Sequence, residues 1–284
     1  MTKSRIIYTR PPLTRRPEAV NVQNAIGRPV PQPPTPIKQQ LVPQPVKLKQ
    51  PTVAHISPAP LSYDEQERIR KIRGKGRGRL LVILGNGPSL AEVDVAKLRS
   101  SCRIDLMTVN HPDPRVWPTP YWVFCDLSQY HRHKHHWDTY QGTIITTTSL
   151  KYDRPNAVKI RSKGGNGFSL DLLDCYYVGR STIYANMQTA MWMDYDHVYI
   201  LGCDMCSAPD GRVWSYGINP DVRPEQRVTR FENEAAFYDH ASKTLPQGVR
   251  SRFTFCSSYN RWDFVDRFNR LPHESAVDVI LEYA

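Results

Sequence analysis

The sequence predicts an α/β protein with a Rossmann-like, mostly parallel sheet and helices on both faces, preceded by an extended, proline-rich N-terminal arm. From residue 80 onward, short apolar and β-branched runs alternate with segments of helical spacing, which is typical of strands buried in a parallel sheet. The composition before that point differs, because 13 of the 24 prolines lie within residues 1–60. We therefore expect an arm at 1–60, a short helix with a Gly/Arg linker at 61–79, and an α/β domain at 80–284.

The arm cannot build a core of its own. Proline fixes φ and lacks a backbone donor, so runs such as "GRPVPQPPTP" favour an extended polyproline conformation. A flexible tail and an arm that drapes over a partner are both consistent with this composition.

The formal net charge of +11 is concentrated at the N-terminal end. Residues 1–60 carry nine Lys/Arg and one acid, a net charge of +8. Residues 61–80 carry seven Lys/Arg and three acids, a net charge of +4. Subtracting both from +11 leaves a net charge of −1 for residues 81–284. The body is thus nearly neutral, and contact with nucleic acid is expected only through the arm. The basic linker "RGKGRGR" is consistent with a solvated segment or with a phosphate contact.

The order of elements follows from the apolar periodicity. The run "LLVIL" at residues 80–84 predicts the first strand, and "SLAEVDVAKLRS" predicts a helix after it, with Ser89 and Glu92 spaced as a capping box. Ser62 and an acidic turn predict the start of the short helix before the linker. Further strands are predicted at residues 104–110, 121–126, 142–149, 197–204 and 252–257, and further helices at 181–195 and 233–245.

No export or membrane signal is present in the sequence. No stretch reaches the roughly 20 apolar residues that a membrane helix needs, and the N-terminus lacks the apolar region of a secretory signal. We therefore expect no membrane contact and a cytoplasmic protein, in the host cytoplasm or the virion if the source is viral. The six cysteines are expected to be buried thiols.

Two clusters contain metal-ligating residue types. "HRHKHH" (131–136) and "CDMC" (203–206) lack the second ligand pair of a structural zinc site, so no metal is predicted. The histidines are expected instead to cap a loop or contact an acidic partner, and to gain charge below a pH of about 6.5.

The segment Gly85–Pro88 joins the first strand to the helix after it. In a parallel sheet, ligands bind beyond the carboxyl ends of the strands, where glycine lets the backbone turn and approach a ligand without a Cβ. Asn86 both donates and accepts, which suits a base or a ribose hydroxyl, and the N–H groups of the following helix suit phosphate. Leu90 replaces the third glycine of a dinucleotide fingerprint, so an ordinary βα turn is the alternative.

"GNGPSLAEVD" resembles the opening motif of the bacterial sialyltransferases that use CMP-activated sugars, a motif shared with pterin pyrophosphokinase-like proteins and many phage proteins. Further similar stretches are "TVNHPD", "STIYANMQTAMWMDYDHVYILGCDM" and "DGRVWSYG", so the resemblance covers roughly residues 80–265 at the level of motifs. It implies a nucleotide-sugar donor, CMP-linked, as the substrate, with no further cofactor required.

The resemblance also implies a set of site residues at strand-to-helix junctions. Those expected to hold the nucleotide, its phosphate or the sugar carboxylate are Gly85, Asn86, Gly87, Ser89, Asn110, Ser181 and Thr182. Asp204 would close the site at a strand end, and Tyr216 would lie near the nucleotide phosphate. The alternative roles of these two residues are a cap on the next turn and a packed aromatic ring.

The family's general base, a histidine in the lid after the Gly-x-Asp strand, has no counterpart in this chain, whose lid is expected around residues 205–232. Asp221 or Glu225 would fill this role only if burial raised the carboxyl pKa. The candidate catalytic residues are therefore Tyr216, Asp204 and Asp221. Nucleotide binding has more support in the sequence than transfer chemistry.

We therefore expect a metal-independent, glycosyltransferase-like protein that transfers a sugar with inversion from CMP to an unknown acceptor. It would dock on a partner assembly, such as the capsid or other proteins of a phage virion, through residues 1–60. A non-catalytic docking protein of such an assembly is the first alternative. The second is phosphoryl or pyrophosphoryl transfer, which would require Mg²⁺ and acidic ligands, with Asp126 and Asp204 as candidates.

Overall fold

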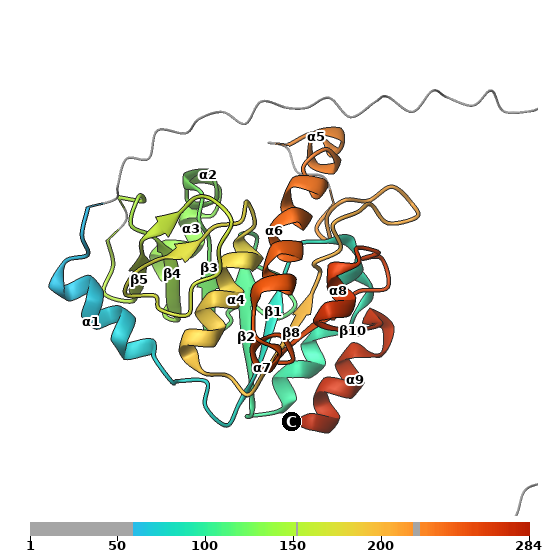
Figure 1. The fold of residues 1–284 in the computed structure, drawn as a ribbon, viewed down its shortest axis with the longest axis horizontal. Coiled ribbons are helices and arrows are strands. Elements are labelled where there is room, and N and C mark those ends of the chain that lie inside the picture. The colour runs from blue at the N-terminus through green and yellow to red at the C-terminus, as the bar shows by residue number, and fades with distance from the viewer. Residues whose placement is uncertain (1–58, 152, 218–221) are drawn as a thin grey trace, which may run out of the picture. The chain divides into compact units, whose positions relative to one another are not determined.

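The computed structural model describes residues 59–151, 153–217 and 222–284 of the chain. The proline-rich arm predicted for residues 1–60 lies outside the described residues except for its last two positions, and so does Asp221. The described part has the α/β fold that the sequence predicts (Figure 1).

Eight strands form one all-parallel sheet in the order β10-β9-β8-β1-β2-β3-β4-β5, and two short strands, β6 and β7, pair in parallel apart from it. The strands of the large sheet are β1 (Leu80–Leu84), β2 (Ile104–Val109), β3 (Tyr121–Val123), β4 (Thr143–Thr147), β5 (Ala157–Ile160), β8 (His197–Leu201), β9 (Phe253–Cys256) and β10 (Asn269–Leu271); those of the small sheet are β6 (Ser162–Lys163) and β7 (Tyr176–Tyr177).

All six strands predicted from the sequence are present in this sheet. The sequence does not reveal the two strands at its edges, β5 and β10. Both are short and interrupted by a basic residue, Lys159 in β5 and Arg270 in β10, so neither shows the continuous apolar run of a buried strand.

The helices predicted around residues 62–79, 181–195 and 233–245 are confirmed as α1 (Tyr63–Ile72), α4 (Thr182–Met193) and α6 (Phe231–Thr244). The start of α1 carries the expected cap, since the Ser62 hydroxyl accepts the N–H of the third helical residue. The other α-helices are α2 (Leu127–Arg132), α3 (Lys134–Thr139), α5 (Pro224–Val228), α7 (Gln247–Arg250), α8 (Phe264–Arg267) and α9 (His273–Tyr283).

The helix predicted over residues 89–100 is wrong. Two 3₁₀ helices, η1 (Pro88–Glu92) and η2 (Val95–Ser100), occupy this segment. The proline stands at the first position of η1, as predicted, but Ser89 and Glu92 form no capping box. Both side chains bind residues far along the chain instead, so the local hydrogen bonds that would start an α-helix are not made.

Alternating side chains of β1 divide the core between the two faces of the sheet. Leu81 and Ile83 pack in one cluster with α1, α4, α6 and α8, whereas Leu80, Val82 and Leu84 pack in another with η1, η2 and α9. Every residue of β1 is buried, and the predicted covering of both faces by helices is confirmed (Figure 1).

Strand β1 marks the point where the chain reverses its direction across the sheet. Strands β2 to β5 follow it outward on one side, and α4 then leads to β8, β9 and β10 on the other side. The carboxyl ends of β1 and β8 therefore flank a topological switch point, the place where open parallel sheets bind ligands.

Acidic side chains of the domain hold the basic linker after α1. Arg77 Nε lies 2.8 Å from Asp194 Oδ2, and Arg79 contacts both Asp105 oxygens, at 2.6 and 2.8 Å. The Tyr195 hydroxyl also donates to Asp105, at 2.8 Å. Two linker arginines thus have internal partners, which favours a structural role for them over a phosphate contact.

Among the described residues, no helix is long and apolar enough to cross a membrane. All six cysteines lie in this part of the chain as free thiols. Cys175, Cys203 and Cys256 are buried as predicted, whereas Cys125 and Cys206 are half-buried. Cys102 is exposed, because it lies in the turn that precedes β2.

We expect Tyr195→Phe to lower the free energy of unfolding by about 1.5–3 kcal/mol, because it removes a hydrogen bond to the buried Asp105 carboxylate. Urea unfolding followed by tryptophan fluorescence measures this change. Tyr63→Phe is the matched control, since the Tyr63 ring is 74% exposed. Equal stability of Tyr195→Phe and the unmodified chain would contradict the expected role of the hydroxyl.

Candidate functional site

Two turns cross at the carboxyl ends of β1 and β8. The Gly85 N–H donates to the Leu201 carbonyl at 2.8 Å, and the Gly87 N–H donates to the Gly202 carbonyl at 2.9 Å. A Cβ at Gly85 would lie 2.4 Å from the Gly202 oxygen, and a Cβ at Gly87 would lie 2.5 Å from Asp204 Oδ2. This packing, which the sequence pattern does not reveal, requires glycine at both positions.

Asp204 links three strand ends through its carboxylate. The residue is 1% exposed; Oδ2 accepts the Ser89 N–H at 2.8 Å, and Oδ1 accepts the Ser89 hydroxyl at 2.6 Å together with the Ser257 hydroxyl. Burial raises the pKa of Asp204, and the hydrogen bonds from Ser257 and Ser89 oppose this rise. Three internal hydrogen bonds fix this carboxylate, which suits a positioning role better than the predicted catalytic one.

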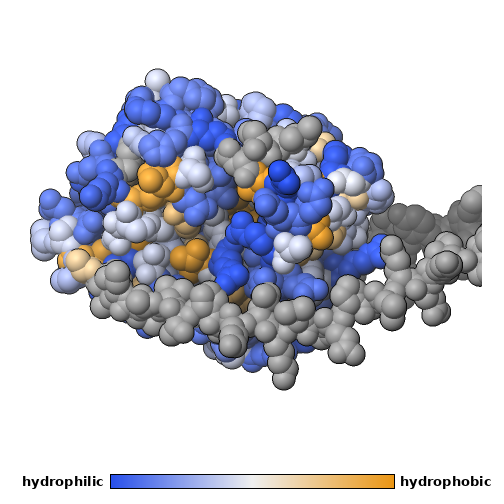
Figure 2. Space-filling model, turned by 90° about the horizontal axis from the view of Figure 1, so that it is seen from above, coloured by the Kyte–Doolittle hydropathy of each residue, from blue (hydrophilic) through white to orange (hydrophobic). Residues whose placement is uncertain are grey.

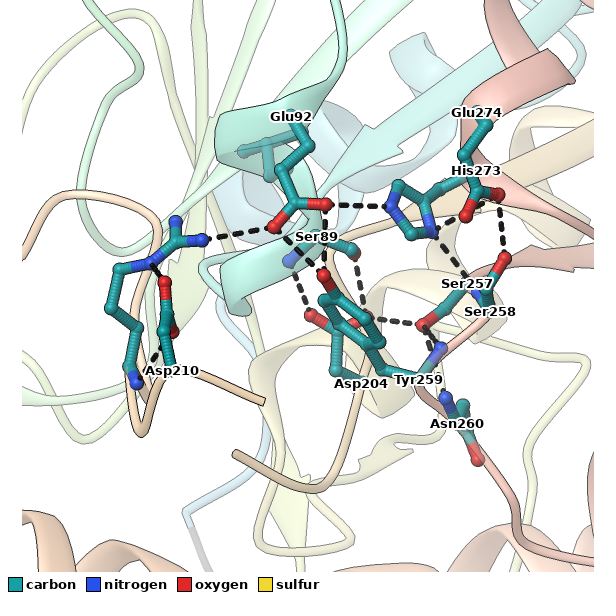
Figure 3. Close-up of polar contacts among 12 residues, drawn as sticks. Ser89, Glu92, Asp204, Asp210, Ser257, Ser258, Tyr259, Asn260, His273 and Glu274 are labelled. Carbon is teal, nitrogen blue, oxygen red and sulfur yellow. Dashed lines mark hydrogen bonds and ion pairs between the residues drawn. The ribbon is translucent and has the colours of Figure 1, made fainter. Parts of the chain in front are cut away.

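A second polar network lies beside this carboxylate, toward the C-terminal helix (Figure 3). Glu92, in η1, accepts hydrogen bonds from the Tyr259 hydroxyl at 2.8 Å and from Arg212 Nη2 at 2.9 Å. His273, at the start of α9, donates from Nε2 to Glu92 at 3.1 Å, while its Nδ1 accepts the Ser258 N–H at 3.1 Å. Partial burial raises the pKa of Glu92, but these hydrogen bonds outweigh it and lower the pKa below its ordinary value. The network ties the segment that carries Arg212 to α9.

A cavity of about 220 Å³, which we call the main cavity, opens beside the crossing turns at the switch point. Its wall contains seven of the ten residues predicted for the site: Asn86, Gly87, Asn110, Ser181, Thr182, Asp204 and Tyr216. Gly85 and Ser89 do not line it, because both are packed against the β8 turn. Asp221 lies outside the described residues.

The start of α4 forms one wall of the main cavity. Asn110, with a left-handed φ of 52°, follows β2, and its Oδ1 accepts the Thr182 hydroxyl at 3.1 Å. The Ser181 hydroxyl pairs with the Tyr238 hydroxyl at 2.9 Å and makes no cap to its own helix. The first N–H groups of α4 are therefore left without a side-chain cap, which favours an anion at this end of the helix.

Arginines and acids also line the main cavity. Arg227 forms a bidentate ion pair with Glu234, whose side chain is 3% exposed. Arg230 Nη2 lies 3.8 Å from the same carboxylate. Arg180 is exposed beside the start of α4 and has no ion pair within the described part of the chain. The surface seen from above, on the side of α2 and α5, is mostly hydrophilic with smaller hydrophobic areas between (Figure 2). A polar, anionic ligand fits this lining.

His111 is a site residue that the sequence analysis missed. It lines a second cavity of about 490 Å³, and Asn86 and Tyr216 line both cavities. The side-chain amide of Asn86 donates to the backbone carbonyl of His111 at 3.1 Å, and the backbone carbonyl of Asn86 accepts the Ser215 N–H at 2.9 Å. The His111 ring lies 4.1 Å from the Tyr216 ring, centroid to centroid. Its position directly after Asn110 was the only sequence signal for it.

The histidine cluster differs from its prediction. His133 is buried, and burial lowers its pKa to about 4, with further lowering by the neighbouring His111. Burial also lowers the pKa of His136. Both rings therefore gain charge at lower pH than an unperturbed histidine does, because desolvation disfavours the charged form.

The "CDMC" pair does not assemble with further ligands. Burial raises the pKa of Cys203 far above its ordinary value and that of Cys206 to about 11, and Cys206 Sγ donates to the Tyr259 carbonyl at 3.2 Å. Within residues 59–151, 153–217 and 222–284, no three His, Cys, Asp or Glu side chains are grouped to hold a metal ion.

A scan against protein-family models, a search of curated proteins and a search of solved structures each found no match to this chain. The resemblance to CMP-sugar sialyltransferases therefore stays a prediction from short motifs.

Asp204→Asn tests the raised pKa of the buried carboxyl group. Because the pKa of folded Asp204 lies above the unfolded value near 3.8, its contribution to stability is fully present below that value and is lost as the pH rises through the folded pKa. The free energy of unfolding of the unmodified chain should therefore fall, relative to the variant, from about pH 4 toward pH 7. Urea unfolding at several pH values measures it.

The control for this measurement is Asp278→Asn, which makes the same chemical change at an exposed position of α9. It should leave the pH dependence of stability as it is in the unmodified chain. If the free energies of unfolding of Asp204→Asn and of the unmodified chain differed by the same amount at every pH, the raised pKa would be contradicted.

Proposed function

We propose that this chain binds a CMP-type nucleotide sugar in the main cavity and transfers the sugar to an acceptor hydroxyl. The observation that carries the proposal is the polar cavity at the carboxyl ends of β1 and β8, the switch point of an all-parallel sheet. Seven residues named from the sequence for a nucleotide site line that cavity.

The lining suggests how the donor is held. Asn86 and Asn110 present amide groups that suit the base and the ribose hydroxyls. The uncapped start of α4 and the exposed Arg180 suit the phosphate, since N–H dipoles and a guanidinium both favour negative charge.

The proposed transfer is a displacement at the sugar carbon that is linked to the phosphate. The acceptor oxygen attacks this carbon, the carbon–oxygen bond to phosphate breaks, and CMP leaves with the electron pair. Arg180 and the start of α4 stabilise the charge that develops on the leaving phosphate, and Tyr216 also lines the cavity.

Phosphoryl transfer has less support from the geometry. It would place Mg²⁺ on acidic ligands such as Asp126 and Asp204, both of which line the main cavity. The Asp204 carboxylate, however, already accepts three hydrogen bonds from Ser89 and Ser257. Binding a cation there would require breaking contacts that hold the turns together.

Calorimetric titration of the full chain with CMP and with cytidine tests the proposed function. We expect CMP to bind more tightly than cytidine, and Arg180→Gln to weaken CMP binding by roughly 10- to 100-fold while leaving cytidine binding unchanged, since a charge-assisted contact to phosphate is lost.

Arg103→Gln is the matched control, because Arg103 is an exposed arginine just before β2. It lies at the amino ends of the parallel strands, whereas the main cavity lies at their carboxyl ends. It should bind CMP as the unmodified chain does. Absence of CMP binding by the unmodified chain, or equal weakening by both variants, would overturn the proposed site.

A further inference from the structure

His111 stands at the junction of the two cavities. It lines the second cavity, and the two residues common to both cavities, Asn86 and Tyr216, contact its backbone and its ring. An acceptor in the second cavity and a donor in the main cavity would therefore meet beside this imidazole. No other histidine lines either cavity in the described part of the chain.

A second histidine, His133, packs against the His111 ring. The His133 ring, from the end of α2, lies 4.9 Å from the His111 ring in an edge-to-face contact. His133 is 5% exposed, and its Nε2 has no hydrogen-bond partner among the described residues. His111 Nδ1 is likewise buried and unpartnered. Two buried ring nitrogens without partners are unusual, because such atoms are normally satisfied.

The charges around His111 favour its neutral form. Burial lowers the pKa of His111, nearby Arg132 and His136 lower it further, and Asp113 opposes them. Two titratable rings contact His111: that of Tyr216, at 4.1 Å, and that of His133, whose own pKa is lowered by burial to about 4. A neutral imidazole has a free lone pair at pH 7 and can accept a proton.

We propose that His111 is the general base of the transfer, and that His133 is a positioning residue that accepts a hydrogen bond from His111 once it is protonated. The proposal rests on the proposed function, since it names the proton acceptor of that reaction. It replaces the lid histidine, which the sequence lacks, by a histidine that follows β2.

The acceptor hydroxyl gives its proton to Nε2 of neutral His111, whose own proton is on the buried Nδ1, and the O–H electron pair forms the bond to the sugar carbon. The bond from that carbon to the CMP phosphate oxygen breaks, and the pair leaves with CMP. The Nδ1–H of the imidazolium then donates to His133 Nε2, and the proton taken up at Nε2 of His111 later passes to solvent.

Hydrolysis of CMP-N-acetylneuraminic acid by the full chain, with water as the acceptor, tests the proposal together with calorimetric CMP binding. We expect His111→Gln to lower kcat by roughly 10²- to 10⁴-fold, the usual effect of losing a general base, while the affinity for CMP stays the same. His131→Gln, at an exposed histidine of α2, is the matched control and should keep kcat.

The pH profile separates positioning from simple packing. His133→Phe should move the acid limb of kcat to lower pH, because the imidazolium of His111 loses a hydrogen bond that stabilises it. His133→Gln keeps an acceptor oxygen and should restore the limb toward that of the unmodified chain. A packing role alone would change stability and leave the limb in place in both variants.

Each result decides one of the two proposals. No CMP binding by the unmodified chain overturns the proposed function itself. If CMP binds, then full kcat in His111→Gln, or no hydrolysis of the probe by the unmodified chain at pH 7, overturns His111 as the base. If the acid limb of the pH profile of kcat stays in place in both His133 variants, the positioning role of His133 is overturned.

Discussion

The Asp204 carboxylate accepts hydrogen bonds from Ser89, on the turn after β1, and from Ser257, on the turn after β9. It lies itself on the turn after β8, so one buried group fixes the ends of three strands that are not consecutive in the chain. A buried carboxylate is costly unless it is fully hydrogen-bonded, which makes this arrangement specific: the turns must meet in one geometry to satisfy it. Glycine at position 87 follows from the same constraint, because a Cβ there would meet the carboxylate.

The crossing of these turns determines what faces the main cavity. Ser89 is buried against Asp204, whereas Asn86 and Gly87 line the cavity. Asn86 also links the segment around Ser215 to the backbone of His111. The Glu92 network holds the same segment from its other end through Arg212. The segment from Arg212 to Ser215, which leads into Tyr216, is therefore held at both of its ends.

The polar groups around the cavities divide into paired and unpaired sets. Arg227 and Glu234 neutralise each other, and Asp204 is satisfied internally, so these groups are committed to structure. Arg180, the start of α4 and the two ring nitrogens of His111 and His133 have no such partners among the described residues. Unpartnered groups of this kind gain most from a ligand, because binding satisfies donors and acceptors that the fold leaves open.

The sequence alone determined the layered α/β architecture. Runs such as Leu80–Leu84, buried on both faces of the sheet, indicate parallel strands by their composition and length. The Gly-Asn-Gly-Pro turn after Leu84 indicates the carboxyl ends of the strands, where the main cavity lies. Most of the predicted site residues line the main cavity for this reason, since the ends of parallel strands share one edge. The edge strands β5 and β10 escaped detection because their few residues include exposed or basic positions.

Only the tertiary structure decided which of these residues bind one another. Ser89 and Glu92 have the spacing of a helix cap, yet Ser89 binds Asp204, 115 residues away, and Glu92 binds His273, 181 residues away. The contact between His111 and His133 likewise depends on how α2 packs beside the end of β2. Local spacing records the period of a helix or strand, whereas these partners are set by strand order and by the packing of turns, which periodicity does not encode.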